Sequence, residues 1–273
     1  MDQNQWTCLF CLSNGPFSDE HIIPESLGND DLILTNQICS KCNNHFSKLE
    51  EYVLQKTPLA LWRTFLGIQT KKRKLPSVNI SQPKQEKGRF SSVHPKHDSI
   101  GFTAHDDGST SVDVFDPNII NEISSGQRDQ FRLVLTPKTL FNLGRFMCKM
   151  GIELVCQENP QEARLSQFEI VKSFSRFGKF DGFWPIFHFS NGHPNDFRRC
   201  GVDTEGFFER VDCYSYQLLQ FGKEYVLFCF GMGSDNWIVS LNDPYPSPEI
   251  TKAFPGMKLN CIWYSPEEMK SKL

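Results

Sequence analysis

The sequence lacks several features that would place it at once in a large class of proteins. It has no apolar run that approaches the ~18–20 residues needed for a membrane-spanning helix. Its first residues, M-D-Q-N-Q, show neither the basic nor the apolar segment of a secretory signal, so we expect a cytoplasmic protein. It also has no glycine-rich phosphate loop, no internal repeat and no Ser/His/Asp arrangement at a recognisable spacing.

The sequence also has no overall excess of positive charge, but its charged residues are unevenly distributed. The formal net charge is −3, which by itself does not indicate a nucleic-acid partner. Residues 1–100 carry 12 Lys/Arg and 10 Asp/Glu, a net of +2, whereas residues 101–273 carry 17 and 22, a net of −5. Residues 56–97 contain ten basic residues and a single acidic one, Glu86, which gives a net charge of +9. The basic charge therefore lies directly after the first 57 residues.

Cysteine is abundant, and its spacing indicates a metal. Four of the ten cysteines form two C-x2-C pairs with 27 residues between them: Cys8, Cys11, Cys39 and Cys42. Such pairs place two sulfurs each on one tetrahedral Zn²⁺, and a site closed by four thiolates is structural rather than catalytic. The other six are isolated, mostly in apolar surroundings, and we predict them to be reduced core thiols; they are Cys148, Cys156, Cys200, Cys213, Cys229 and Cys261.

The segment between the cysteine pairs carries a specific motif. Residues 20–28 read E-H-I-I-P-E-S-L-G, and Asn43 directly follows the second pair. Over roughly residues 6–57 this arrangement resembles the HNH, or ββα-metal, endonuclease family, in the subgroup that has this signature between CxxC pairs. The resemblance implies that His21 is the general base and that Glu20 and Asn43 are ligands of a catalytic Mg²⁺ or Mn²⁺ ion. It also implies that Asn36 is the central Asn of the family name and holds the loop through its amide.

The chemistry of phosphodiester hydrolysis independently favours these residue types. The reaction needs a water deprotonated near neutral pH and a divalent ion beside the scissile phosphate. Histidine has a suitable pKa for the first task, and carboxylate and amide oxygens suit Mg²⁺. Glu20 and His21 would diverge on a regular strand, so this role requires an irregular strand end. His45 lies about 200° around a helix from Asn43, which is why we prefer Asn43 as the ligand.

Simpler interpretations of the same residues stay open at this point. Glu20 and His21 could be solvated loop residues, and Asn43 could be a helix-capping residue. Asp19 and Glu25 are expected to be solvated, although either could reach a metal through water.

The whole pattern predicts an α+β protein in three parts. Residues 1–57 form a zinc-stapled ββα-metal module, 58–98 a helix and a basic linker, and 99–273 a larger α+β domain with antiparallel strands. Helical periodicity marks residues 43–55, 59–66 and about 136–156. Short strands are expected around the turn Asp107-Gly108 and in residues 183–190, 207–221, 224–231, 236–241 and 259–264. Residues 70–97 lack a helical period and are predicted to be a connection that could order on substrate.

These features lead to the hypothesis of a metal-dependent DNA endonuclease, with restriction or phage defence as the context by analogy and RNA as an alternative substrate. A short basic run could contact backbone phosphates or be a solvated surface: Lys71, Lys72, Arg73 and Lys74. One alternative is a non-catalytic zinc module that binds nucleic acid or protein. Another is a nuclease gated by a C-terminal sensor of a ligand or partner protein, which the acidic charge beyond residue 100 favours. Cutting both strands would need a homodimer or sequential nicking.

Overall fold

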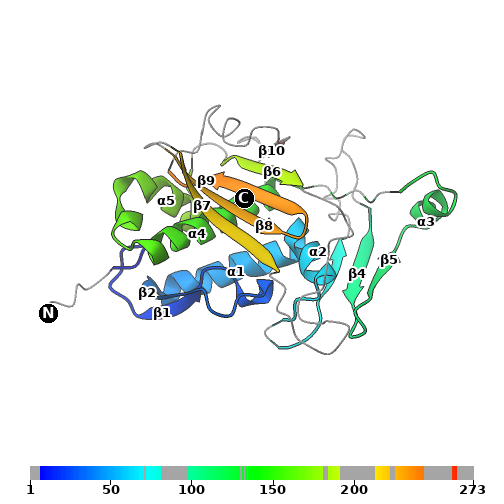
Figure 1. Cartoon of the computed structure of the whole chain (residues 1–273), viewed down its shortest axis with the longest axis horizontal. Helices are drawn as coiled ribbons and strands as arrows, with labels where there is room; N and C mark the ends of the chain where they lie inside the picture. The colour runs from blue at the N-terminus through cyan, green and yellow to red at the C-terminus, as the bar shows by residue number, and fades with distance from the viewer. Residues whose placement is uncertain are drawn as a thin grey trace, which may run out of the picture.

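The computed structural model shows a mixture of helices and antiparallel sheets, as predicted (Figure 1). It describes residues 7–70, 72–80, 98–129, 131, 133, 135–180, 184–190, 213–221, 225–242 and 260–262. No helix within those ranges is long and apolar enough to cross a membrane.

The N-terminal part is a β-hairpin followed by a helix. Strands β1 (Phe17–His21) and β2 (Ile33–Cys39) pair antiparallel, and α1 (Ser40–Lys56) follows directly. The predicted apolar stripe of α1 is buried, including Phe46 and Val53, both 0% exposed. The helix begins three residues before the predicted start at residue 43, because Cys39 is the N-terminal flanking residue. Asn43 therefore lies inside the helix rather than at its cap.

Helix α4 (Pro137–Glu158) is the central packing element of the molecule. It contacts α1 on one side and strands β8 (Tyr225–Met232) and β9 (Asp235–Ser240) on the other. Side chains from all three regions belong to a single buried cluster, which is why this helix is apolar around most of its circumference. At Gly151 a Cβ atom would lie 2.8 Å from the Cβ of Phe228, so a side chain there would push α4 away from the sheet.

The C-terminal sheet has the order β10-β6-β9-β8-β7, with every neighbouring pair antiparallel. Its remaining strands are β6 (Ile186–Ser190), β7 (Tyr214–Phe221) and β10 (Asn260–Ile262). Each of the five strands predicted from residues 183 onward is confirmed where the structure describes it. The predicted ranges 207–212 and 263–264 lie outside the described residues. Helix α5 (Glu169–Phe177), which we did not predict, packs beside α4.

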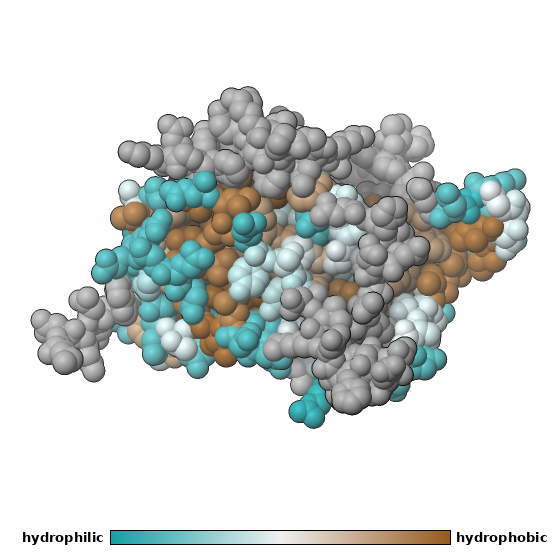
Figure 2. All heavy atoms as spheres, viewed as in Figure 1, coloured by the Kyte–Doolittle hydropathy of each residue, from teal (hydrophilic) through white to brown (hydrophobic). Residues whose placement is uncertain are grey.

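A smaller lobe lies beside α2 (Pro58–Phe65), at the right of Figure 1. Its sheet is β3-β4-β5, from Ser77–Ile80, Ile100–Ala104 and Thr110–Val114, and α3 (Pro117–Ser124) follows. The hairpin around Asp107-Gly108 is confirmed, but β3 corrects the prediction that residues 70–97 are only a connection. The strand β3 forms because it pairs with β4, which is distant in the sequence. Residues 81–97 lie outside the described ranges. Hydrophobic residues gather over this lobe (Figure 2), with Phe115 58% exposed.

The isolated cysteines only partly match the prediction of reduced thiols. Cys148, Cys156 and Cys229 are free, as predicted. Cys213 is disulfide-bonded, so the prediction is wrong for this residue. It lies just before β7 and is half buried, packed against the edge of the main apolar cluster. Cys200 lies outside the described residues, and for Cys261 only the backbone is described, so the prediction stays untested for both.

Candidate active site and zinc site

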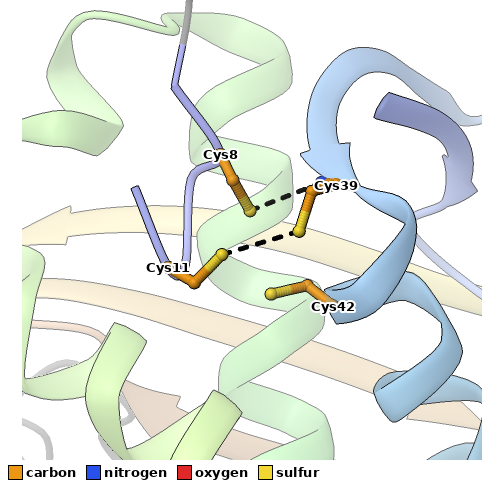
Figure 3. A group of neighbouring side chains, drawn as sticks. All are labelled: Cys8, Cys11, Cys39 and Cys42. Atoms are coloured by element: carbon orange, nitrogen blue, oxygen red, sulfur yellow. Dashed lines mark hydrogen bonds between the residues drawn. The ribbon is translucent and has the colours of Figure 1, made fainter. Parts of the chain in front are cut away.

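The four paired cysteines converge at the junction of β2 and α1 (Figure 3). Their sulfur atoms all lie within 4.8 Å of one another, and the Cys11 and Cys39 sulfurs are 3.5 Å apart. Tetrahedral Zn–S bonds of about 2.3 Å separate the sulfurs by about 3.8 Å, so this donor set fits one Zn²⁺. It is the one group of three or more His, Cys, Asp or Glu ligands that could hold a metal among the described residues.

Hydrogen bonds to sulfur favour a thiolate at Cys8, whereas the bond to Cys8, together with burial, raises the pKa of Cys42. The backbone N–H of Cys39 donates to the Cys8 sulfur over 3.4 Å, and Arg176 Nε donates to the Cys42 sulfur over 3.1 Å. The hydrogen bond from Cys42 lowers the pKa of Cys8 to about 4. Because Arg176 belongs to α5, the C-terminal region contributes directly to the surroundings of the zinc site.

The hairpin is irregular just before Glu20. Ser18 pairs with Ile38, but Glu20 pairs with Leu34, so three residues of β2 lie opposite Asp19. Asn36 is in this bulge, exposed and with a φ of 56°, a left-handed conformation that asparagine tolerates better than most residues. The structure thus accounts for asparagine at this position by its backbone conformation.

His21 lies at the end of β1, half buried, on the side of the strand that also carries the exposed side chain of Asp19. Asn43 reaches this strand from the first turns of α1. Its Nδ2 donates to the carbonyl oxygen of Asp19 over 2.8 Å and to Ser18 Oγ over 3.1 Å. Asn43 therefore does not cap the helix, and its amide oxygen faces away from these two acceptors. Asn43 is thus tied to strand residues beside the β-bulge, on the same strand that carries His21.

The comparison with known protein families agrees with this geometry. Residues 8–57 match the family model described as HNH endonuclease. These residues, called the HNH module below, are similar to that family. The match ends one residue after α1, so it covers the zinc cluster, the hairpin and the helix but none of the C-terminal region. No curated protein and no solved structure gives a significant match to the chain.

Glu20 of the HNH module does not share the exposed side of β1 with His21. The strand alternation turns it inward, where it is 5% exposed and its Oε1 lies 2.6 Å from Nζ of Lys149. Burial raises the pKa of Glu20, and the attraction of Lys149 partly offsets that effect. The bulge precedes Glu20, so it does not bring the two neighbouring side chains together.

The loop between the two strands is held by an asparagine that we did not single out from the sequence. Asn29 is fully buried, and its Nδ2 donates to the carbonyl oxygens of Ile23, at 2.6 Å, and Leu32, at 3.1 Å. Its Oδ1 accepts from the backbone N–H groups of Asp31 and Leu32. Asn29 therefore holds this loop, and the loop-holding role of Asn36 stays a prediction. Its position directly after Gly28, whose φ is 95°, is the local signal that could have found it.

His45 of the HNH module points in a different direction from Asn43, as their angular separation on α1 predicts. Its Nε2 lies 3.0 Å from Nη2 of Arg145, on α4. Burial, together with the charges of Arg176 and Arg145, lowers the pKa of His45 to about 4. The neutral ring can accept a hydrogen bond from Arg145, so His45 joins the module to α4 rather than to the bulge.

The predicted phosphate contacts lie after α2. Lys72, Arg73 and Lys74 are exposed, whereas Lys71 lies outside the described residues. The backbone turns here, with the N–H of Thr70 donating to the carbonyl oxygen of Lys74 over 2.9 Å. Both predicted roles of this run, phosphate binding and a solvated surface, require such exposure.

Proposed function

We propose that this protein is a metal-dependent endonuclease that hydrolyses phosphodiester bonds in DNA. The observation that supports the proposal is the match of residues 8–57 to the HNH endonuclease family, within which Asn43 is hydrogen-bonded to the strand that carries Asp19 and His21. His21 accepts the proton of the attacking water, and the half-buried end of β1 leaves its ring within reach of a substrate. Restriction or phage defence is the biological context that we propose from the resemblance.

The catalytic ion that we propose is Mg²⁺ or Mn²⁺, which would stabilise the charge developing at the scissile phosphate. Asn43, whose Nδ2 is hydrogen-bonded to the Asp19 backbone, would offer its amide oxygen, and Asp19 would offer its exposed carboxylate. Mg²⁺ retains several waters and needs only one or two carboxylates, so this donor set fits. Glu20 is the acidic ligand implied by the resemblance. To bind the ion it would have to leave Lys149, and the loss of this partner from a buried ammonium costs free energy. We therefore propose Asp19 for this role.

Supercoiled plasmid provides the direct test. We expect the purified protein to convert it to relaxed circles with Mg²⁺ or Mn²⁺ and to leave it intact with EDTA. Because each module cuts one strand, linear product should follow later, or appear at once if two copies act together. A His21→Ala protein purified in the same way controls for contaminating nucleases. No nicking with either ion would contradict the proposal, and faster cleavage of a matched RNA would make RNA the substrate.

The basic run should contribute a salt-dependent part of DNA binding. Neutralising Lys71, Lys72, Arg73 and Lys74 to Gln should reduce the slope of log K against log[salt] by up to about 0.9 for each phosphate that the variant no longer neutralises. The effect should be similar for unrelated DNA sequences, because phosphate contacts position a protein without reading bases. Binding titrations at several salt concentrations measure this slope. A wild-type slope would mean that the run is a solvated surface.

A gated nuclease is the second candidate that the contacts support. Helices α4 and α5 hold the HNH module through Arg145, which reaches His45, and through Arg176, which reaches Cys42. A ligand or partner of the C-terminal region that shifted these helices would therefore act on the module through these two arginines.

A further inference from the structure

A fully buried lysine of α4 lies behind the active-site strand. Lys149 is 0% exposed, and its Nζ is 2.6 Å from Glu20 Oε1, 3.1 Å from Glu50 Oε1 and 3.0 Å from Glu153 Oε2. These carboxylates come from β1, α1 and α4 itself. One ammonium therefore joins both elements of the HNH module to a helix outside it.

The same ammonium binds the backbone at the end of β1. Nζ of Lys149 donates to the carbonyl oxygen of His21 over 3.1 Å and lies 3.4 Å from that of Ile22. The contact to His21 is to the backbone of the proposed general base, so it restrains the residue without occupying its ring.

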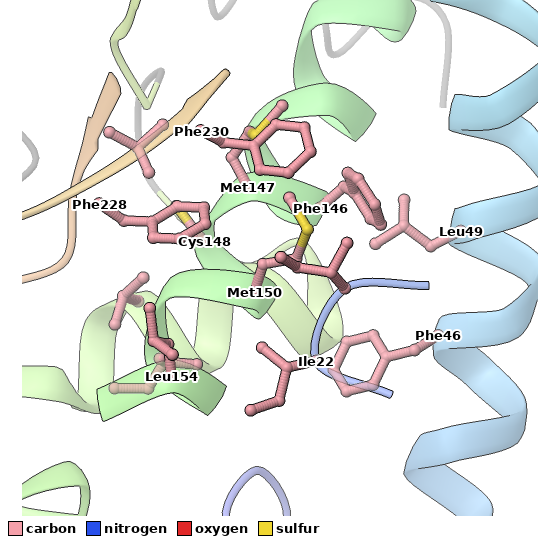
Figure 4. Close-up of a cluster of buried hydrophobic side chains, with 14 of the residues drawn as sticks. Ile22, Phe46, Leu49, Phe146, Met147, Cys148, Met150, Leu154, Phe228 and Phe230 are labelled. Carbon is pink, nitrogen blue, oxygen red and sulfur yellow. The ribbon is translucent and has the colours of Figure 1, made fainter. Parts of the chain in front are cut away.

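The surroundings explain why this position needs a charged group. Ile22, Phe46 and Met150 belong to the apolar cluster between α1 and α4 (Figure 4), and Nζ lies 5.8 Å from the centre of the Phe46 ring. Burial acts to lower the pKa of Lys149, but the carboxylates of Glu153, Glu20 and Glu50 outweigh it and hold that pKa above its ordinary value. An apolar side chain of similar length would fill the space but would leave Glu20 without a partner and two carbonyl oxygens without a donor.

We propose that Lys149 is a positioning residue of the nuclease site. It neutralises the inward-facing Glu20 and holds the carbonyl oxygens after it, and thereby orients His21 toward substrate. The inference rests on the proposed function, since it concerns the same site. It means that the segment matched as an HNH module is incomplete without α4, and that the C-terminal region takes part in catalysis by fixing the base.

The first experiment compares Lys149→Met with Lys138→Met in the full-length protein. Lys138 is an exposed lysine on the same helix, so its variant controls for the removal of one positive charge. Lys149→Met should lower kcat for plasmid nicking by roughly 10- to 100-fold, the scale of a small misplacement of a reacting group. KM for DNA and zinc content should stay at wild-type values, because the substitution touches neither the phosphate-binding residues nor the cysteines. Lys138→Met should match wild type.

The double variant Glu20→Gln/Lys149→Met separates this role from metal binding by Glu20. A neutral amide needs no counter-charge, so the double variant should recover a large part of the decrease in kcat seen in Lys149→Met. If Glu20 instead binds the catalytic ion, the double variant will be no more active than the single one, which would overturn the proposal. If Lys149→Met does not retain zinc, kcat of the double variant is compared with that of wild type instead. The double variant leaves no unpaired charge on Glu20.

A readout independent of activity distinguishes failure of this inference from failure of the proposed function. The imidazole signals of His21, identified by their loss in His21→Ala, report its position in NMR spectra of the full chain. They should shift or broaden in Lys149→Met and stay unchanged in Lys138→Met. If wild type does not nick DNA but the His21 signals respond, the proposed nuclease function fails while the positioning contact stands. Wild-type kcat and unchanged His21 signals in Lys149→Met would refute the positioning role.

Discussion

Replacing His21 with alanine should lower the rate of metal-dependent nicking by at least about 10²-fold, the usual scale for loss of a general base. The substitution removes the imidazole but keeps the carbonyl oxygen that accepts a hydrogen bond from Lys149. It also leaves the four cysteines untouched, so the fold and one zinc per chain should persist. Initial rates on supercoiled plasmid measure the loss of nicking. Elemental analysis measures the zinc content, and circular dichroism measures the fold.

His105→Ala is the matched control for this substitution. His105 is exposed and follows β4 in the small lobe, where its Nε2 lies 2.9 Å from Ser111 Oγ. Its removal should leave nicking unchanged. If His21→Ala nicks at the wild-type rate, the attacking water must be activated by another group, and the roles proposed for Asp19 and Asn43 would need to be reassigned as well.

Replacing Cys42 with serine should remove the zinc and with it the folded HNH module. Structural zinc contributes about 10–16 kcal/mol of apparent binding free energy in zinc-finger peptides. Whole domains have only about 5–15 kcal/mol of stability, so the module cannot absorb such a loss. Cys42 is fully buried, and its substitution also deprives Arg176 of its sulfur acceptor. We expect well under one zinc per chain, a lower unfolding temperature and no nicking.

Cys229→Ser controls for the change from thiol to hydroxyl. Cys229 is a free, half-buried cysteine on β8 and belongs to a different hydrophobic cluster from the zinc site. Its variant should keep one zinc per chain and nick at the wild-type rate. A Cys42→Ser protein with full zinc content and wild-type stability would show that the four cysteines do not form a zinc site.

The parts of the site that follow from nearby residues could be predicted without a structure. The two C-x2-C pairs and the E-H-I-I-P-E-S-L-G segment indicated a hairpin and a helix around four sulfurs, and these elements are present. The apolar periodicity of residues 136–156 likewise predicted α4, and the alternating C-terminal segments predicted the antiparallel strands. In each case the pattern works because side chains close in sequence share one face of a helix or strand.

Contacts between distant parts of the chain could not be predicted in this way. Nothing in the sequence around Glu20 shows that it faces Lys149, which follows the neighbouring His21 by 128 residues. The isolated basic residues Arg145 and Arg176 give no sign that they reach His45 and Cys42. The strand β3 was not predicted for the same reason, because its extended conformation depends on pairing with β4.

Periodicity and cysteine spacing were thus sufficient to predict the four-cysteine cluster and the helices α1, α2 and α4. The packing of α4 against α1 and β1 alone decided which acidic side chain faces inward and which stays exposed. The physical reason is burial: a carboxylate can leave water only where a cation meets it, and Lys149 meets Glu20 but not Asp19. That pairing arises only when the C-terminal region closes over the HNH module.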